Sequence, residues 1–331
     1  MNKIVHITGG CGYVGSRTAV ALAKGGYKTI IVDKATPEER RAILPADSEY
    51  RKADLTDPAQ ARESLKDAEF VIHLAANIGP INYMWDKQAE ILWENTAIDA
   101  GVYPAFQAAG TKLVMYSSTS MVHQHSPRYP YVETDLKDTP PPTNVYGYSK
   151  LGGEYFCRAY KQQYGGPNYV VIRFHNIYGP GEDSKGSTPG DIHVIPALIE
   201  KVLRGKYPLP LIGDPEATRP FTYIDDVVDA VVQLFEKALA GEQGVLNTDF
   251  NIASPEETRI LDLAEMTWRM FGDGRPFAFT AEETNASKTS SHRRAADISK
   301  LLSVIDWKPK LTLEEGMQRT ATWVREVIAR G

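Results

Sequence analysis

The sequence has only two cysteines, no cluster of basic residues and no long apolar run. Cys11 and Cys157 cannot build a disulfide framework among 331 residues, and their spacing is not that of a metal site, so we expect no metal. A net charge of −5 without a basic run argues against a nucleic-acid partner. The chain lacks a stretch of about 18 apolar residues and, at "MNKIVHITGG", a signal-peptide core; we expect a soluble cytoplasmic protein with no membrane partner.

The first half of the chain alternates short, β-branched apolar segments with longer helical patterns. Strands are predicted at 3–7, 28–32, 70–74, 112–117 and 169–174, and helices near 13–25, 58–67, 86–109 and 147–164. Buried strands that alternate with helices predict βαβ units, and therefore an α/β fold with a Rossmann-type, doubly wound parallel sheet.

The pattern of alternating strands and helices changes after residue 175. Gly and Pro cluster at 178–191 and 207–220, and helical patterns follow at 194–204, 224–239, 259–270 and 313–329. We expect a first domain at 1–175 and a smaller C-terminal α/β lobe at 176–331, with loops that close over the edge of the sheet. Part of 220–252 could pack back on the first domain.

The segment "HITGGCGYVG" places Gly9, Gly12 and Gly15 after a strand and at the start of a helix. Glycines there allow a tight turn and let backbone N–H groups approach a pyrophosphate at the helix N-terminus. Asp33 ends the next strand, where a carboxylate accepts hydrogen bonds from the adenosine ribose and repels a 2′-phosphate. This favours NAD over NADP. For Asp54, contact with the adenine and a helix cap before Pro58 stay open.

Tyr146 and Lys150 lie four residues apart on a predicted helix and therefore share one face. A phenol with a pKa of about 10 is a poor base, but a nearby ammonium favours the phenolate. An isolated Tyr-x-x-x-Lys is common on surface helices. Here it accompanies a Gly-rich turn and the segment "YSSTS" at 116–120, which favours a catalytic role.

Together these motifs resemble the extended short-chain dehydrogenase/reductase family, and more narrowly its NAD-dependent nucleotide-sugar epimerases and dehydratases. The motifs are TGGCGYVG, Asp33, HLAA (73–76), YSSTS, YGYSK (146–150), RFHNIYGP (173–180), RPFTYIDD (219–226) and RRAAD (293–297). The resemblance implies that NAD binds in the first domain and a nucleotide diphosphate sugar in the second lobe. It implies Tyr146 as base, Lys150 on the nicotinamide ribose, and Thr119 sharing the proton of the substrate hydroxyl.

The predicted contacts form two sets. The cofactor set is Gly9, Gly12, Tyr13, Val14, Gly15, Asp33, Asp54, Leu55, Leu74, Ala75, Ala76, Ser117, Tyr146 and Lys150. The substrate set is Ser118, Thr119, Ser120, Met121, His123, Asn176, Val194, Arg219 and Arg294, with Arg293 as the alternative to Arg294. Arginines suit a diphosphate because a guanidinium binds phosphate oxygens in pairs.

Met121 separates this chain from several members of the family. The resemblance places an acidic pair of the 4,6-dehydratases at Ser120 and Met121, and a Glu of the decarboxylases or a Cys of GDP-mannose 3,5-epimerase at Met121. A second catalytic group of that epimerase, a Lys, is replaced by His193 or Val194. Methionine neither gives nor takes a proton. This argues against elimination, decarboxylation and epimerisation at C3 or C5.

What remains is a 4-epimerase that acts through a transient 4-keto sugar. The loops at 76–84 and 173–180 resemble those of GDP-mannose 3,5-epimerase, so we expect a GDP-sugar or, second, a UDP-sugar. Open alternatives are a 4-dehydrogenase that releases the keto sugar, a 3,5-epimerase-like enzyme and a non-catalytic protein that senses NAD and a sugar nucleotide. The resemblance also implies a homodimer built on 86–109 and 147–164. The roles of His123, His125 and His193 stay open.

Overall fold

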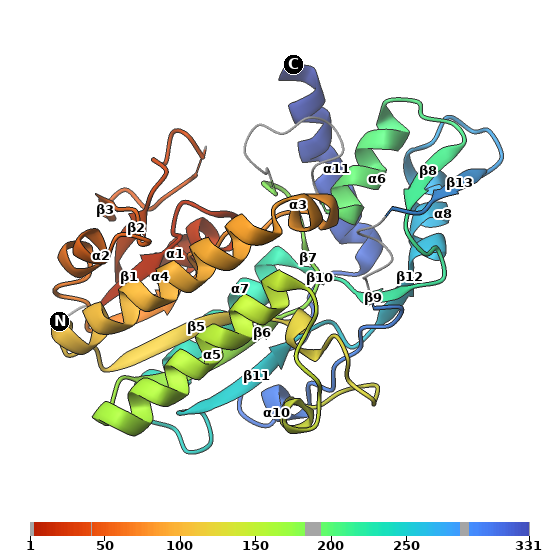
Figure 1. The fold of residues 1–331 in the computed structure, drawn as a ribbon. Helices are drawn as coiled ribbons and strands as arrows, with labels where there is room; N and C mark the ends of the chain where they lie inside the picture. The colour runs from red at the N-terminus through yellow and green to blue at the C-terminus, as the bar shows by residue number, and fades with distance from the viewer. Residues whose placement is uncertain (1–2, 41, 183–192, 285–290, 331) are drawn as a thin grey trace.

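The computed structural model describes residues 3–40, 42–182, 193–284 and 291–330, and its centre is a seven-stranded sheet (Figure 1). Its strands are β1 (Ile4–Thr8), β2 (Lys28–Asp33), β3 (Glu49–Lys52), β4 (Phe70–His73), β5 (Leu113–Thr119), β6 (Asn168–Phe174) and β11 (Thr248–Ile252). The order is β11-β6-β5-β4-β1-β2-β3, and all neighbours are parallel. The predicted α/β fold is confirmed. The chain winds outward from β1 in both directions, which opens a crevice beside β1 and β4.

Helices cover both faces of the sheet because the central strands are apolar on both sides. In β2, Ile31 packs into the core of one face, while Ile30 and Val32 pack into the core of the other. The first core includes side chains of α1 (Tyr13–Lys24), α7 (Ile224–Leu239) and α10 (Ser299–Leu302). The second includes those of α2 (Pro58–Ser64), α4 (Gln88–Ala109) and α5 (Val145–Tyr164).

A smaller lobe with its own apolar core stands beside the carboxyl edge of the sheet (Figure 1). Its helices are α6 (Val194–Leu203), α8 (Ile260–Phe271) and α11 (Leu313–Arg330). Short strands pair as β7 (Ile177–Tyr178) with β10 (Thr222–Tyr223), β8 (Leu209–Ile212) with β13 (Phe279–Glu282), and β9 (Thr218–Pro220) with β12 (Glu257–Arg259). The described chain also contains α3 (Ile81–Asp86) and the 3₁₀ segments η1 (Ser120–His123) and η2 (Glu133–Lys137).

The division into 1–175 and 176–331 remains a proposal. α7 and β11 belong to the second part by sequence but pack with the first domain. Helix α7 packs on α1, and β11 pairs with β6 at the edge of the sheet. The expected helix at 86–109 is confirmed as α4, and α3 precedes it as a separate short helix. Of the Gly- and Pro-rich stretch 178–191, residues 183–191 lie outside the described part of the chain. Within the described ranges, no helix is long and apolar enough to cross a membrane.

Candidate active site

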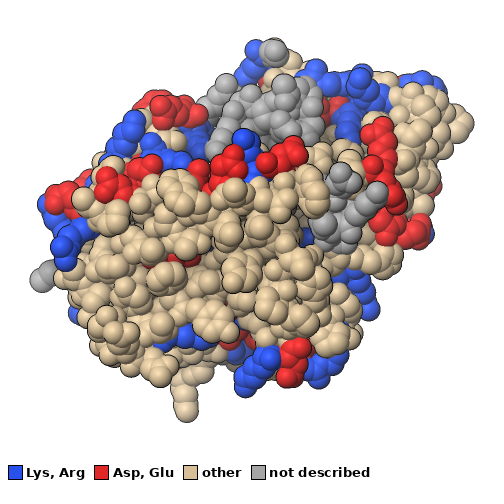
Figure 2. All heavy atoms as spheres, in the orientation of Figure 1, with Lys and Arg blue, Asp and Glu red and all other residues tan. Residues whose placement is uncertain are grey.

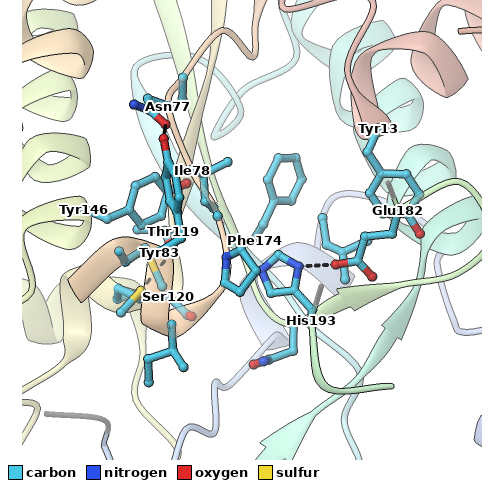
Figure 3. A pocket seen from close by; sticks show the side chains of 18 of the residues that line it. Tyr13, Asn77, Ile78, Tyr83, Thr119, Ser120, Tyr146, Phe174, Glu182 and His193 are labelled. Atoms are coloured by element: carbon cyan, nitrogen blue, oxygen red, sulfur yellow. Dashed lines mark hydrogen bonds and ion pairs between the residues drawn. The ribbon is translucent and has the colours of Figure 1, made fainter. Parts of the chain in front are cut away.

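A cavity of about 1140 Å³ opens at the carboxyl ends of the parallel strands. Its walls come from the turn after β1, the ends of β2, β4, β5 and β6, and α6 with its neighbours in the second lobe (Figure 3). Ligands of open α/β sheets bind at such a place, where the strand order reverses.

All of the predicted site residues except Lys150 and His123 line this one cavity. They are Gly9, Gly12, Tyr13, Val14, Gly15, Asp33, Asp54, Leu55, Leu74, Ala75, Ala76, Ser117, Ser118, Thr119, Ser120, Met121, Tyr146, Asn176, Val194, Arg219 and Arg294. The fold thus brings together residues from both halves of the chain.

The Gly-rich turn fits a dinucleotide because it has no room for side chains. Gly9 has φ +68°, and a Cβ on it would lie 2.8 Å from the backbone of Ala75. A Cβ on Gly15 would lie 2.3 Å from the carbonyl oxygen of Gly9. Helix α1 starts directly after Gly12, which offers no side chain as a cap. The N-terminus of α1 therefore faces the cavity with backbone N–H groups, which suit a pyrophosphate.

Two carboxylates mark the end of the cavity that suits an adenosine. Asp33 accepts hydrogen bonds from the N–H groups of Cys11 and Ala35, both at 3.0 Å, and these hold its side chain at the mouth of the turn. Asp54 accepts from the Thr56 backbone N–H at 3.0 Å and from the Thr56 hydroxyl at 2.7 Å. The N-cap of α2 is Asp57, so of the two roles predicted for Asp54 the helix cap is excluded.

Tyr146 stands near the start of α5, across from the end of β5 (Figure 3). Asn144 begins this helix by accepting a hydrogen bond from the Gly147 N–H at 3.1 Å. A Cβ on Gly147 would lie 2.9 Å from the Met121 carbonyl oxygen, so glycine allows α5 to pack closely on η1. Burial raises the pKa of the Tyr146 phenol. Without a ligand the phenol is therefore protonated, and deprotonation needs a nearby positive charge.

Lys150 lies one turn further along α5 and is buried rather than exposed in the cavity. Its Nζ stands 4.2 Å from the centre of the Tyr116 ring. Burial lowers the pKa of the ammonium, although the carboxylate of Asp99 acts in the opposite direction. In this structure Lys150 supports the wall behind Tyr146, and its predicted contact with a ribose stays a prediction.

The loop after β5 presents hydroxyl groups and a thioether to the cavity. The Thr119 Oγ1 accepts a hydrogen bond from the Met121 N–H at 3.3 Å, which leaves the hydroxyl proton of Thr119 to be donated elsewhere. Ser120 and Met121 line the cavity as well. The loop residues that line the cavity, 117–121, include no carboxylate and no imidazole, so their side chains supply no strong general acid at this wall.

The prediction that His123 contacts the substrate is wrong, because its side chain points away from the cavity into the protein. Its ring stacks on Tyr131 at 4.4 Å, and its Nε2 lies 3.3 Å from the Arg173 guanidinium. Burial, followed by the charge of Arg173, holds the pKa of His123 well below its usual value. His123 is thus a neutral packing residue. His125 is exposed and lies 3.3 Å from the Thr143 hydroxyl.

Two arginines meet at the part of the cavity formed by the second lobe. Arg219 donates to the carbonyl oxygens of Thr218 at 2.6 Å and Ser291 at 2.8 Å. Burial, followed by the charge of Arg294, lowers the pKa of Arg219 to about 9. Two cations that disfavour each other in a buried place suit a dianionic ligand. Arg293 binds Glu257 at the surface instead, so Arg294 is the arginine of the pair that faces the cavity.

Two polar pairs on the cavity wall were not predicted from the sequence. The Tyr83 hydroxyl donates to the Asn77 Oδ1 at 2.9 Å. Glu182 and the Nδ1 of His193 form an ion pair beside Tyr13 (Figure 3). Burial alone would lower the pKa of His193, but the Glu182 carboxylate raises it. The first pair lies in the 76–84 loop, whose resemblance to a relative was a signal in the sequence. Glu182 lies in no motif that could have predicted its role.

The parallel sheet, the glycine turn and the Tyr146 wall define a dinucleotide-dependent enzyme of the α/β class. Residues 5–253 match the model of the NAD dependent epimerase/dehydratase family, so the chain belongs to that family. It is an NAD-dependent enzyme of the extended short-chain dehydrogenase/reductase type, as the motifs predicted.

Its relatives differ in the reaction they catalyse. The dTDP-L-rhamnose 4-epimerase of Burkholderia thailandensis is 28% identical, over 99% of this chain and 96% of the relative. GDP-mannose 3,5-epimerase of Arabidopsis thaliana is 25% identical, over 99% and 84%. The crystal structure of UDP-glucose 4-epimerase with UDP-glucose from Thermotoga maritima has a TM-score of 0.83 at 25% identity, over 98% and 99%. Other relatives are reductases and decarboxylases, so the family does not decide the specific reaction.

Proposed function

We propose that the protein is an NAD-dependent nucleotide-sugar 4-epimerase that acts through a transient 4-keto sugar. The observation that carries this proposal is the wall around Tyr146. Thr119, Ser120 and Met121 line the cavity there, and none of the three is an acid that can protonate a departing hydroxyl or a base that can take a proton from carbon. Tyr146 and Thr119 suffice for the proton of one alcohol.

In the proposed reaction the sugar lies with its C4 hydroxyl at Tyr146 and Thr119. Gly9, Gly12 and Gly15 would hold NAD along the glycine turn, and its nicotinamide would supply a hydride acceptor for C4 and a hydride donor for the 4-keto sugar. Tyr146 takes the hydroxyl proton, and Thr119 donates to the same oxygen and orients it. Arg219 and Arg294 hold the diphosphate, so the sugar can turn over while its nucleotide stays bound.

We infer that the nucleotide is UDP or GDP. The Thermotoga relative was solved with UDP-glucose, and the plant relative is named for GDP-mannose. Purified protein incubated with UDP-, GDP-, dTDP- and CDP-sugars tests the proposal, with NMR following the stereochemistry at C4 and absorbance following NADH. The 4-epimer without net NADH supports it. Stoichiometric NADH with a ketone supports a 4-dehydrogenase, and loss of a C3 or C5 proton to deuterated solvent supports a 3,5-epimerase.

Tyr146→Phe provides the matched test of the wall. The variant should lose turnover by about 100-fold or more while nucleotide binding survives, because only the phenol oxygen is removed. Tyr148→Phe, an exposed tyrosine on the same helix, is the control and should retain activity. Turnover at the wild-type rate in Tyr146→Phe contradicts the assigned role.

We also propose a homodimer that pairs α4 and α5 with those of a second copy. Four aromatic side chains on these helices are more than half exposed: Trp93, Tyr148, Tyr155 and Tyr164. Figure 2 shows a broad area over α4 and α5 with few charged side chains. Such a surface suits an isologous interface. Sedimentation of the wild type should give a dimer, and Tyr155→Lys should give a folded monomer; a wild-type monomer at micromolar concentration contradicts the proposal.

A further inference from the structure

A fully buried lysine needs a negative charge to remain an ammonium, and the structure offers three acidic groups near Lys150. They are Asp99 on α4 and Glu154 and Cys157 on α5. Lys150 is only 2% exposed, with its Nζ over the Tyr116 ring at 4.2 Å. The ring face is attractive for a cation but does not neutralise it.

Two of the three acidic groups are engaged elsewhere. Glu154 binds the Arg173 guanidinium through both oxygens, each at 2.9 Å, and it accepts from Arg158 at 3.0 Å. Its charge is therefore already compensated. The Cys157 Sγ lies 2.7 Å from the Tyr103 hydroxyl, and burial raises the pKa of its thiol, which stays neutral at ordinary pH. Asp99 is the carboxylate that remains for Lys150.

The hydrogen-bond partners of Asp99 are neutral donors, which leave its negative charge uncompensated. The Tyr116 hydroxyl donates to one carboxylate oxygen at 3.1 Å, and the His73 Nε2 lies 3.2 Å from the other. Burial lowers the pKa of His73, so its ring is neutral. Because the Asp99 carboxylate only accepts, the neutral His73 ring carries its proton on Nε2, and its Nδ1, which lies 2.5 Å from the Thr8 Oγ1, accepts from that hydroxyl.

We propose that Asp99 is the buried counter-ion of Lys150 and acts as a positioning residue for the proton transfer at Tyr146. The carboxylate keeps an ammonium one helical turn behind the phenol, where that positive charge favours the phenolate. The hydrogen bonds from Thr8 to His73 and from His73 to Asp99 connect this carboxylate to the end of β1, where the glycine turn begins. A Cβ on Gly153 would lie 1.7 Å from the Tyr116 hydroxyl, so the packing leaves this network little freedom. The inference rests on the proposed function for its catalytic consequence only.

The ionisable groups around Lys150 come from four elements. They are Asp99 and Tyr103 on α4, His73 on β4, Tyr116 on β5, and Tyr146, Glu154 and Cys157 on α5. A test must therefore separate Asp99 from neighbours that also carry protons. Asp99→Asn keeps the shape and removes the charge, and Asp99→Ser is a smaller neutral replacement should the first variant fold poorly. Cys157→Ser is the matched control, because serine keeps the contact with Tyr103.

The first measurement needs no sugar. NMR titration of NAD-bound protein with isotope-labelled lysine follows the Lys150 signal, assigned by its loss in Lys150→Arg. In Asp99→Asn and Asp99→Ser the Lys150 titration should move to lower pH by about one pH unit or more, as expected for loss of a close opposite charge. Cys157→Ser should titrate as the wild type does. An unchanged Lys150 titration in a folded Asp99→Asn overturns the proposal, as does an equal shift in Cys157→Ser.

The second measurement uses whichever sugar nucleotide the enzyme turns over. The alkaline limb of the kcat profile should move to lower pH in Asp99→Asn while KM changes less than about threefold, because Asp99 touches no ligand. A loss of kcat equal at all pH values overturns the link to Tyr146. Should no sugar nucleotide react, the proposed function fails, and the lysine titration still decides whether Asp99 is the counter-ion.

Discussion

Gly153→Ala should destabilise the protein, because α5 crosses β5 too closely there for any side chain. The added Cβ would lie 1.7 Å from the Tyr116 hydroxyl and 2.5 Å from the Asp99 Oδ2, and Tyr116 is fully buried. Overpacking costs about 1–3 kcal/mol. Separation of Tyr116 from Asp99 adds about 1–3 kcal/mol for unpaired buried polar groups. The gain in helix propensity offsets about 1 kcal/mol.

We therefore expect a net loss of about 3 kcal/mol in the free energy of unfolding, which a protein with about 5–15 kcal/mol survives in folded form. Urea unfolding followed by circular dichroism measures it. Gly152→Ala is the matched control on the same helix, because a Cβ there meets no atom within 4 Å and should add up to about 1 kcal/mol. Sedimentation of both variants separates any effect on a dimer. Gly153→Ala with wild-type stability refutes the reasoning.

Three further predictions concern ligands and acid. Arg294→Met should raise the KM for the sugar nucleotide by about 10-fold or more through loss of a charged hydrogen bond, while Arg293→Met should change it little. Equal effects of the two variants would contradict the anion site. Asp33→Ser should lower the preference for NAD over NADP by about 10-fold or more, measured as the ratio of their dissociation constants, and an unchanged ratio would exclude a role in that choice. Burial alone would raise the pKa of Glu154, but Arg173 lowers it from 4.5 to about 2. Its contribution to stability is present above pH 4.5 and lost as pH falls towards 2, so the stability of Glu154→Gln, measured by acid titration at fixed urea, should depend less steeply on pH in that range.

Local sequence was sufficient for the elements whose physical signal is local. The central strands are buried on both faces and therefore appear as continuous apolar segments, and the observed strands lie within two residues of the predicted ones. The two edge strands were not among the apolar segments. β3 has the sequence EYRK and is partly exposed, while β11 contains Asp249 and Asn251, whose partners come from distant segments.

The sequence by itself determined the class of enzyme. The glycine turn and the pair of Tyr146 and Lys150 each depend on residues a few positions apart, and Asp33 is identified by its place at the end of the next strand. Only the tertiary structure decided which side chains face the cavity. His123 and Met121 are two residues apart on η1, yet one ring is locked against Tyr131 and Arg173 while the other side chain lines the cavity. Asp99 carries no local signal. It meets His73 and Tyr116, whose ring also contacts Lys150, only because α4, β4, β5 and α5 pack together.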